Sequence, residues 1–361
     1  MRPATEEELA VCIRDAKGPL AIMGGGTRSI ALTEGEVLST SALRGIELYE
    51  PGALTLVALA GTPLAEIEAT LAKERQRLPF EVPDMRGLLG RDGTSTIGGV
   101  VAANASGPRR VQAGACRDSL IGVRMVTGDG AIIKNGGRVM KNVTGYDLVK
   151  LVAGAWGTLG VLTEVSFKLL PVPAASATLV LRGLSDAQAV AAMSAALGSP
   201  YEVSGAAHLP GEGTFLRIEG FAASVAYRTD RLREHLAAHG TVEVEENAAR
   251  WPGLRDVAAF HGRAGDVWRL SVKPSDAPAI TARLGADAVQ YDWGGGLIWA
   301  LVPEGTDLRA RLGAFQGHAT RIRGQGPGAF QPEPSAIAAL TQGLRAKFDP
   351  RGLFNTGLMG A

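Results

Sequence analysis

The sequence predicts an α+β protein made of two different folding units. The chain has 361 residues, 46% of them hydrophobic and 20% charged, a globular composition long enough for about two domains. Many of its 48 glycines precede residue 165, as expected where backbone must approach another group closely. After Pro173 the order becomes β-α-β-β-α-β, the split-βαβ or ferredoxin-like pattern. We expect domains at 1–173 and 174–330, and a C-terminal helix and tail at 331–361 that return to the first domain.

In the first unit, apolar periodicity and turn residues predict the elements in order. Residues 5–16 predict an amphipathic helix, and residues 19–23 predict a buried strand that runs into a glycine loop. A helix is expected after the strand at 54–61, with Thr62 as its cap and Pro63 in its first turn. The remaining strands are expected in a hairpin around Asp129-Gly130 and at 157–171.

In the second unit, the same order of elements occurs twice. The first half predicts strands at 177–182, 202–209, 214–220 and 241–245, with helices at 185–198 and 224–239. The first of these helices begins with a Ser185-x-x-Gln188 capping box. The second half predicts strands at 267–273, 287–292, 297–302 and 319–323, with helices at 275–284 and 306–315. We expect one antiparallel sheet with helices on one face, followed by a last helix at 335–347.

Charge and cysteine content exclude several classes of protein. The net charge is +1 without a basic stripe, so we expect no nucleic-acid partner. The two cysteines, Cys12 and Cys116, form neither a disulfide framework nor a zinc spacing, so we expect no metal. No apolar run reaches the roughly 18–20 residues of a membrane span. The acidic N-terminal helix lacks a signal pattern, so we expect a cytoplasmic protein, with association to a membrane through partners as the alternative.

Glycine-rich loops are the main chemical signal of the first unit. The stretch "IMGGGTRSIAL" is not a Walker A loop, because Thr27-Arg28 follows the last glycine, and Ser29 stands where a dinucleotide fingerprint needs glycine. Alone, it fits a phosphate loop or a tight turn. Three further stretches share its character, namely "TSTIGGVVAANASG", "KNVTGYDL" and "GAWGTLGVLTEV". Together they predict a long, flat, doubly charged ligand whose pyrophosphate contacts backbone N–H groups.

In this order the loops resemble the FAD-binding domain of the vanillyl-alcohol oxidase family, also called PCMH-type, over residues 24–165. "GPRR", "VMKNVTGYDL", "WRLSV", "GHATRIRG" and "FDPRGLFNTGLM" are similar to the FAD-binding subunits of bacterial glycolate oxidases. The resemblance implies a flavoprotein subunit of an enzyme that oxidises a small 2-hydroxy acid such as glycolate to glyoxylate. It also implies two partners, a paralogous catalytic flavin subunit and an iron–sulfur subunit that passes electrons onward.

The resemblance assigns FAD-binding roles to residues of these loops. The family pattern places the pyrophosphate at Gly24, Gly25, Gly26, Thr27, Arg28 and Ser29. A second flavin-contacting stretch corresponds to Thr96, Gly98, Gly99, Ala102, Asn104 and Gly107, and the turn holding the nucleotide half to Gly157, Thr158, Gly160, Val161 and Thr163. That turn departs from the common G-S-E-G-T form, since it reads Gly-Ala-Trp-Gly-Thr. Lys141 is either a cation near the polar edge of the flavin or an ordinary surface lysine.

The candidates for chemistry lie mostly in the second unit. None of the five histidines falls in the flavin domain, so we expect non-covalent FAD, and Cys116 is expected to be a small buried residue. Oxidation of a 2-hydroxy acid needs a base for the hydroxyl proton and a cation for the carboxylate. The candidate bases are His261 and His318, and the candidate cations include Arg217, Arg269, Lys273, Arg321 and Arg323. Each has a structural alternative: the histidines as loop caps, the arginines as a solvated face.

Three functions remain open at this point. The first is an FAD-binding subunit that takes part in glycolate oxidation, directly or as an electron relay. The second is an accessory subunit that keeps the flavin fold to stabilise a catalytic partner, with weak or absent FAD. The third is a stand-alone FAD-linked dehydrogenase of another 2-hydroxy acid, which the lack of a convincing base disfavours.

Overall fold

The computed structural model describes residues 1–31, 33–137, 145–326 and 328–360. The first part of the chain forms a parallel pair, β1 with β2, and a five-stranded sheet in the order β3-β4-β8-β6-β7. The strands are β1 (Leu20–Met23), β2 (Glu36–Ser39), β3 (Ile46–Glu50), β4 (Thr55–Leu59), β6 (Leu120–Val126), β7 (Ile132–Gly136) and β8 (Val161–Lys168). A small pair joins β5 (Gln76–Arg77) to β9 (Leu170–Pro171). The helices are α1 (Glu6–Asp15), α2 (Leu64–Lys73), α3 (Arg86–Leu89), α4 (Ile97–Ala102), α5 (Arg110–Ala113), α6 (Cys116–Ser119) and α7 (Leu148–Val152).

Local chemistry explains the helix starts. Thr5 caps α1 as its side chain accepts from the backbone N–H of Glu8 at 3.1 Å, and Leu9 and Ile13 are buried on its inner face. The predicted Thr62 cap of α2 is wrong. The Thr62 hydroxyl instead bonds the backbone of Gly45, 3.0 Å from its nitrogen and 2.9 Å from its oxygen, and α2 begins after Pro63 without a side-chain cap.

The rest of the chain builds one eight-stranded sheet in the order β13-β10-β12-β11-β15-β16-β14-β17, with every pair antiparallel. The strands are β10 (Ala175–Leu181), β11 (Gly205–Leu209), β12 (Gly213–Gly220), β13 (Val242–Glu245), β14 (Asp266–Val272), β15 (Ala288–Asp292), β16 (Leu297–Val302) and β17 (Gly317–Arg323). The helices are α8 (Asp186–Leu197), α9 (Ala222–His235), α10 (Trp251–Arg255), α11 (Ala277–Leu284) and α12 (Leu308–Leu312).

This sheet confirms the predicted α+β class and the predicted pairing of two halves. In each half the fourth strand lies beside the first, which lies beside the third, and the second comes last. The halves meet at β11 and β15, where His208 pairs with Tyr291. The predicted capping box at α8 is confirmed, because the Ser185 N–H donates to the Gln188 side chain at 2.9 Å and the Ser185 hydroxyl accepts from the Gln188 N–H at 3.4 Å.

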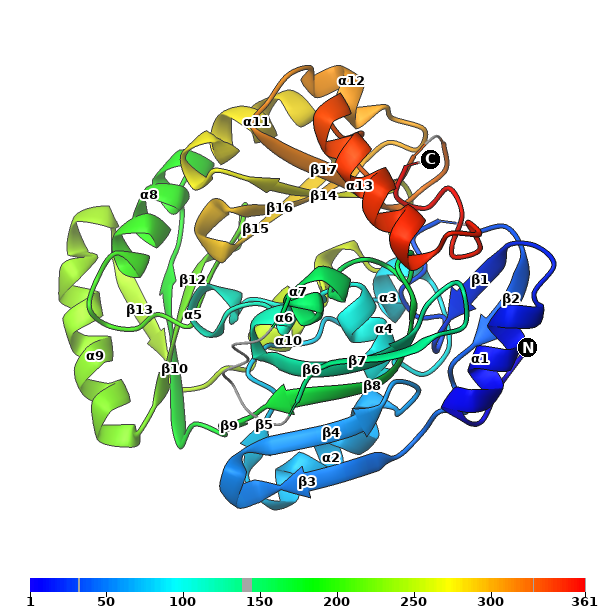
Figure 1. Cartoon of the computed structure of the whole chain (residues 1–361). Helices are drawn as coiled ribbons and strands as arrows, with labels where there is room; N and C mark the ends of the chain where they lie inside the picture. Colours follow the sequence, from blue (N-terminus) through cyan, green and yellow to red (C-terminus); the bar gives the residue numbers. More distant parts are fainter. Residues whose placement is uncertain (32, 138–144, 327, 361) are drawn as a thin grey trace.

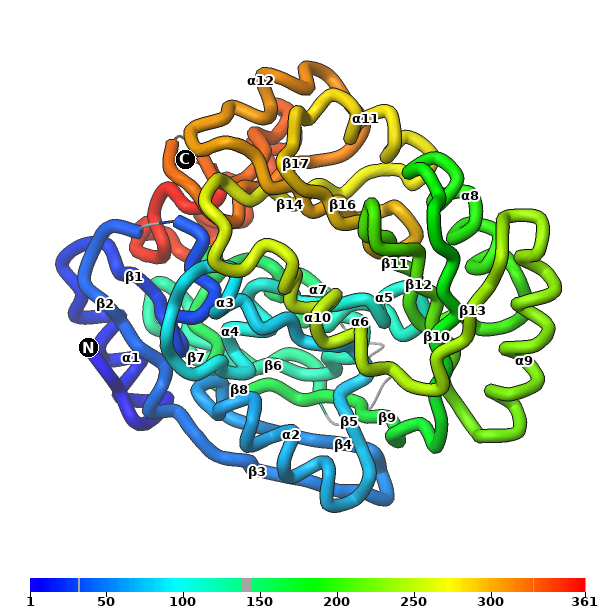
Figure 2. The backbone as a smooth tube through the Cα atoms, turned by 180° about the vertical axis from the view of Figure 1, so that it is seen from behind, coloured from blue at the N-terminus to red at the C-terminus, as the bar shows by residue number. Residues whose placement is uncertain are grey.

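Helices cover the outer face of the large sheet, and the first part of the chain lies against its inner face. Figure 1 shows α8, α9, α11 and α12 along the outside of the sheet, and Figure 2 shows the same arrangement from behind. Apolar side chains of these helices, among them Met193, Leu232 and Ile280, form the core beneath the sheet. The inner face is therefore free to build a site with the glycine-rich loops.

The C-terminal segment bridges the two parts. Helix α13 (Ser335–Phe348) lies beside β17, and the tail after it runs along β1 (Figure 1). The N–H of Leu20 donates to the oxygen of Leu353 at 2.7 Å, and the N–H of Ile22 donates to the Asn355 side chain at 2.8 Å. These bonds fix the tail next to the glycine loop that follows β1.

Candidate functional site

Three of the four glycine-rich stretches line a common cleft, here called the glycine cleft. Of the fourth, "KNVTGYDL", residues 141–144 lie outside the described residues and residues 145–148 do not line the cleft. The walls of the cleft come from the loop after β1, the start of α4, the turn before β8 and the C-terminal tail. Thirteen of the predicted cofactor-binding residues line it: Gly24, Gly25, Gly26, Thr27, Arg28, Ser29, Thr96, Gly98, Gly99, Ala102, Gly157, Gly160 and Val161. Segments more than a hundred residues apart in sequence therefore converge on one site.

Four predicted residues lie elsewhere. Asn104 lines a neighbouring pocket described below. Gly107, Thr158 and Thr163 do not line the glycine cleft. The backbone of Gly107 bonds Glu81 and Trp293, whereas the Thr158 hydroxyl donates to the oxygen of Ala155 at 2.7 Å. Lys141 lies outside the described residues.

The loop after β1 presents backbone N–H groups to the glycine cleft. Within the described residues, none of the N–H groups from Gly25 to Ser29 donates to an acceptor of the chain. The glycines let this loop pack closely: a Cβ on Gly25 would lie 1.5 Å from the oxygen of Thr94, and Gly26 has a φ of +74°. Successive N–H groups without an acceptor form a nest for an anion, and a pyrophosphate fits this arrangement.

Arg28 adds a positive charge between the glycine cleft and the pocket beside it. Its guanidinium donates to the oxygen of Pro83 at 2.8 Å and to the Ser95 hydroxyl at 2.6 Å, while its Nε has no partner among the described residues. Burial lowers its pKa to about 10, so it is still a cation at neutral pH. The group lines both cavities.

Some residues of the glycine cleft lie outside the glycine-rich motifs and could not be predicted from them. Thr40, Ala60, Asn355 and Leu358 all line the glycine cleft. Asn355 also holds the turn before β8, because its amide donates to the oxygen of Trp156 at 2.7 Å. Asn355 and Leu358 belong to the tail motif "FNTGL". The motif does not itself predict a place in the cleft, because only the topology of the chain brings the tail beside β1.

A second cavity, here called the arginine pocket, lies between the glycine cleft and the inner face of the large sheet. It shares Arg28, Ile30 and Trp156 with the glycine cleft. The sheet contributes Arg269 from β14, Trp299 from β16 and His318 from β17, and the loop after β15 contributes Trp293. The first part of the chain contributes Asn104, Ser106 and Arg110, and the segment before α13 contributes Phe330 and Glu333.

Two arginines of this pocket lie over one indole ring. The Cζ atoms of Arg110 and Arg269 are 4.5 and 5.1 Å from the ring centroid of Trp293. Among the described residues, neither guanidinium has an ion pair or a hydrogen bond with the chain. Burial lowers the pKa of Arg110, and it lowers that of Arg269 to about 10, so both remain charged at neutral pH.

Asp292 acts on the charge of Arg269 but does not neutralise it. Burial raises the pKa of Asp292 to about 8, so its carboxyl is largely protonated at neutral pH. The Asp292 side chain instead accepts a hydrogen bond from the backbone N–H of Trp293 at 2.7 Å. With Arg28, the described residues of the pocket thus include three arginine side chains against one acidic side chain, Glu333, and this excess of positive charge suits a small organic anion.

His318 is the one predicted base that lines the arginine pocket. Partial burial lowers its pKa, and the charges of Arg269 and Arg110 lower it further. A depressed pKa keeps the imidazole neutral at physiological pH, so it can accept a proton there.

The other predicted catalytic residues lie outside the arginine pocket. His261 donates through Nε2 to the backbone oxygen of Asp256 at 2.8 Å and lines a separate surface hollow. Arg217 is enclosed in ion pairs with Glu81 and Glu219. Arg323 donates to the oxygens of Leu88, Gly265 and Arg263, and Arg321 donates to the oxygen of Gly326. Lys273, the last of the candidate cations, lines neither the glycine cleft nor the arginine pocket.

Comparisons with known proteins define the class. A family model described as an FAD binding domain matches residues 1–136. A solved alkyldihydroxyacetonephosphate synthase superposes with a TM-score of 0.70 at 15% identity, covering 99% of this chain and 76% of that chain. A chitooligosaccharide oxidase gives 0.68 at 13% identity, covering 100% and 91%. The chain is an FAD-binding oxidoreductase of the PCMH type, with the fold of the vanillyl-alcohol oxidase family, and FAD is its cofactor.

A full-length relative narrows this class to a family. Glycolate oxidase subunit GlcE of Escherichia coli strain K12 is 37% identical over 360 residues, which cover 98% of this chain and 96% of that protein. The chain therefore belongs to the glycolate oxidase subunit GlcE family. A D-lactate dehydrogenase of Archaeoglobus fulgidus is 33% identical over 178 residues, covering 47% of this chain and 38% of that protein. No helix of the described residues is long and apolar enough to cross a membrane.

Proposed function

We propose that the chain is the FAD-binding subunit of a glycolate oxidase and that it oxidises a small 2-hydroxy acid, glycolate to glyoxylate, in the arginine pocket. The observation that carries this proposal is the contact between the two cavities. A cleft with a nest of backbone N–H groups opens beside a pocket that holds an unpaired cation, Arg269, and a neutral base, His318. Cofactor and substrate would then meet near Trp156, which lines both.

The residues of the chain divide the work of the reaction. Arg269 binds the substrate carboxylate and so fixes the orientation of C2. The unprotonated nitrogen of His318 takes the hydroxyl proton as the alkoxide develops into a carbonyl. Bound FAD supplies the acceptor for the hydride that leaves C2, which balances the two-electron oxidation. Trp293, Trp299 and Phe330 restrict water around the reacting carbon.

FAD is held without a covalent bond in this proposal. His208 is buried in the second sheet, with Nδ1 2.9 Å from the Thr214 hydroxyl, and does not line the glycine cleft. Cys116 is fully buried, its pKa is raised by burial, and it also lies outside the glycine cleft and the arginine pocket. Retention of FAD then rests on the N–H nest and Arg28.

The proposed partners are a paralogous flavin subunit and an iron–sulfur subunit that takes electrons from the reduced flavin. The support is the family membership together with two relatives that are glycolate oxidase subunits, GlcE of Escherichia coli and GlcD of Bacillus subtilis. GlcD of Bacillus subtilis is 45% identical over 86 residues, 24% of this chain and 18% of that protein. Attachment to a membrane would then occur through these partners.

Anaerobic spectroscopy of the purified chain tests the proposed function. A yellow protein whose flavin absorption bleaches on addition of glycolate is the expected result. A folded but colourless protein would support an accessory role instead. A yellow protein that glycolate leaves unbleached, but another 2-hydroxy acid reduces, would support a stand-alone dehydrogenase of that acid.

A Gly99→Asp variant tests the glycine cleft. Only the Thr96 hydroxyl lies within 4 Å of an added Cβ, at 3.3 Å, so the carboxylate would extend into the cleft and repel the pyrophosphate. We expect FAD to be lost on gel filtration. Gly18→Asp is the matched control, because nothing lies within 4 Å of a Cβ on this exposed residue. Gly25→Asp is a poorer probe, since its Cβ would strike Thr94 rather than the ligand.

A further inference from the structure

We infer that Arg110, from the first part of the chain, is a second carboxylate-binding residue of the arginine pocket, and that Arg109 is the residue that positions it. The inference rests on the proposed function, because it names how the substrate anion is recognised. The pocket would select small acids whose carboxylate lies between guanidinium groups contributed by both parts of the chain. Neutral alcohols would bind poorly.

The first argument is the charge balance around Arg110. Its guanidinium lies over Trp293, where it shares the ring with Arg269, and it has no acceptor among the described residues. The repulsion is mutual, because the charge of Arg110 is one cause of the lowered pKa of Arg269. Holding two like charges in one pocket is unfavourable without an anion. A carboxylate between them would supply charge-assisted hydrogen bonds to both.

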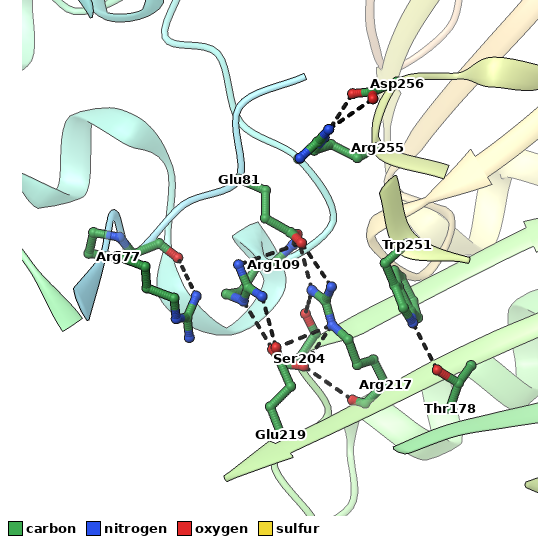
Figure 3. Close-up of polar contacts among 12 residues, drawn as sticks. Arg77, Glu81, Arg109, Thr178, Ser204, Arg217, Glu219, Trp251, Arg255 and Asp256 are labelled. Carbon is green, nitrogen blue, oxygen red and sulfur yellow. Dashed lines mark hydrogen bonds and ion pairs between the residues drawn. The ribbon is translucent and has the colours of Figure 1, made fainter. Parts of the chain in front are cut away.

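The second argument is the way its neighbour is fixed (Figure 3). Arg109 donates through Nε and Nη2 to Glu219, at 3.0 and 2.8 Å, and its N–H donates to Glu81 at 2.8 Å. Glu81 in turn accepts from Arg217 at 2.8 and 3.0 Å. This buried network ties the backbone on which Arg110 begins α5 to strand β12 of the large sheet.

A third contact fixes the indole that both arginines share. The Nε1 of Trp293 donates to the backbone oxygen of Gly107 at 3.1 Å. Gly107 itself is packed against Glu81, whose oxygen accepts its N–H at 2.8 Å and whose Cβ would lie 3.0 Å from a Cβ on Gly107. Residues 107–110 and the loop after β15 are thus held together. The bonds of its neighbours therefore fix the position of Arg110, although its own guanidinium forms no ion pair with the described residues.

Calorimetric titration of oxalate into the FAD-loaded protein tests this inference. Oxalate is a small dianion that this reaction cannot oxidise, so its binding reports recognition without turnover. We expect Arg110→Gln to weaken oxalate binding at least about 10-fold, since it removes charge-assisted hydrogen bonds. Arg117→Gln is the control: it removes the same charge close by, but its side chain is 49% exposed and faces Asp118, so we expect less than about a 2-fold change.

Arg109→Lys separates positioning from a merely structural role. The charge stays, but the two bonds to Glu219 cannot both form. We expect KM for glycolate to rise several-fold with little change in kcat, in a protein that still binds FAD. Unchanged KM would contradict the positioning role of Arg109.

The outcomes separate this inference from the proposed function. If glycolate bleaches the flavin while Arg110→Gln binds oxalate like the unchanged protein, the inference fails and the function stands. If Arg110→Gln weakens oxalate binding but no 2-hydroxy acid reduces the flavin, the anion site stands and the function fails. If Arg110→Gln does not fold, Arg110→Met serves in its place, because it removes the charge but keeps an apolar chain over Trp293, and oxalate binding equal to that of the unchanged protein would overturn the inference.

Discussion

Arg109 and Arg110 are neighbours in sequence but differ in their partners. Arg109 belongs to a buried network with Glu81, Arg217 and Glu219, in which every charge faces an opposite one. Arg110 faces the arginine pocket, where its guanidinium lies over an indole ring and forms no ion pair with a carboxylate of the described residues. Both lie between the two parts of the chain, so the difference concerns chemistry rather than location.

The comparison teaches which buried arginines of this protein stabilise the fold and which are available to a ligand. Burial alone would raise the pKa of Glu219, but the bonds from Arg109 and the charge of Arg217 lower it to about 2. At neutral pH the charges of the network are therefore paired with one another. Among the described residues, Arg110 and Arg269 of the pocket have no such partners, and two buried cations without partners are unfavourable unless a bound anion neutralises them.

The largest expected effect, on the stability of the fold, comes from removing the carboxylate that pairs with a buried arginine. Glu81→Gln leaves Arg217, whose side chain is 1% exposed, without its main carboxylate. Breaking a buried ion pair in this way costs about 3–5 kcal/mol, which thermal unfolding would report as a clear fall in Tm. Glu243→Gln is the control, since the Arg182–Glu243 pair is 49% and 54% exposed and should contribute about 0–1 kcal/mol.

The Glu81 network also predicts an acid sensitivity. The pKa of Glu219 is lowered in the folded state, so its contribution to stability is full above the ordinary glutamate range and is lost as the pH falls toward 2. Although burial acts the other way, the charge and hydrogen bond of Arg217 lower the pKa of Glu81 as well, so Glu81→Gln should remove the share of the acid loss that comes from Glu81 itself. An equal drop in stability for Glu81→Gln and Glu243→Gln would mean that the network contributes no more than a surface pair.

An intermediate effect is expected from removing an unpartnered arginine. Arg269→Gln should raise KM for glycolate by about 10- to 100-fold, because one charge-assisted contact to the carboxylate is lost. The Tm should change little or rise, since the like charge beside Arg110 is relieved. Steady-state kinetics and a melting curve on the same preparation check both. A large fall in Tm with unchanged KM would place Arg269 among the structural arginines.

The smallest expected effect is a shift in the pH profile. Partial burial and the charges of Arg269 and Arg110 lower the pKa of His318, so flavin reduction should keep its rate below the ordinary histidine pKa and fall only at lower pH. Arg269→Gln removes one of these charges, so the acid limb should move to higher pH. Stopped-flow reduction at a series of pH values measures it. An acid limb that stays in place would exclude His318 as the base.

Local sequence signals predicted most of the fold and the glycine cleft. The repeated order of strands and helices predicted the large sheet, because each half carries its own turn and capping residues. Thr62 was predicted as a cap from its position alone, yet its hydroxyl is bonded to Gly45. Short helices such as α3, α5 and α10 escaped prediction, since segments of four or five residues carry no periodicity.

The arginine pocket could be predicted only in part. Arg269 and His318 were candidates because the oxidation of a 2-hydroxy acid needs a cation and a base. Arg110 and Trp293 were not, since their contact joins a loop of the first unit to a loop 183 residues later in the sequence. Partnered and unpartnered arginines look alike in a sequence. Arg217 was a candidate for the same reason as Arg269, and only the positions of Glu81 and Glu219 distinguish them.

The most direct test of this account is a crystal structure of the FAD-loaded protein with oxalate bound. The account predicts FAD in the glycine cleft and oxalate between Arg110 and Arg269, with His318 on the side of the reacting carbon. A structure in which oxalate occupies another site, or in which both arginines have turned to carboxylates of the chain, would contradict it.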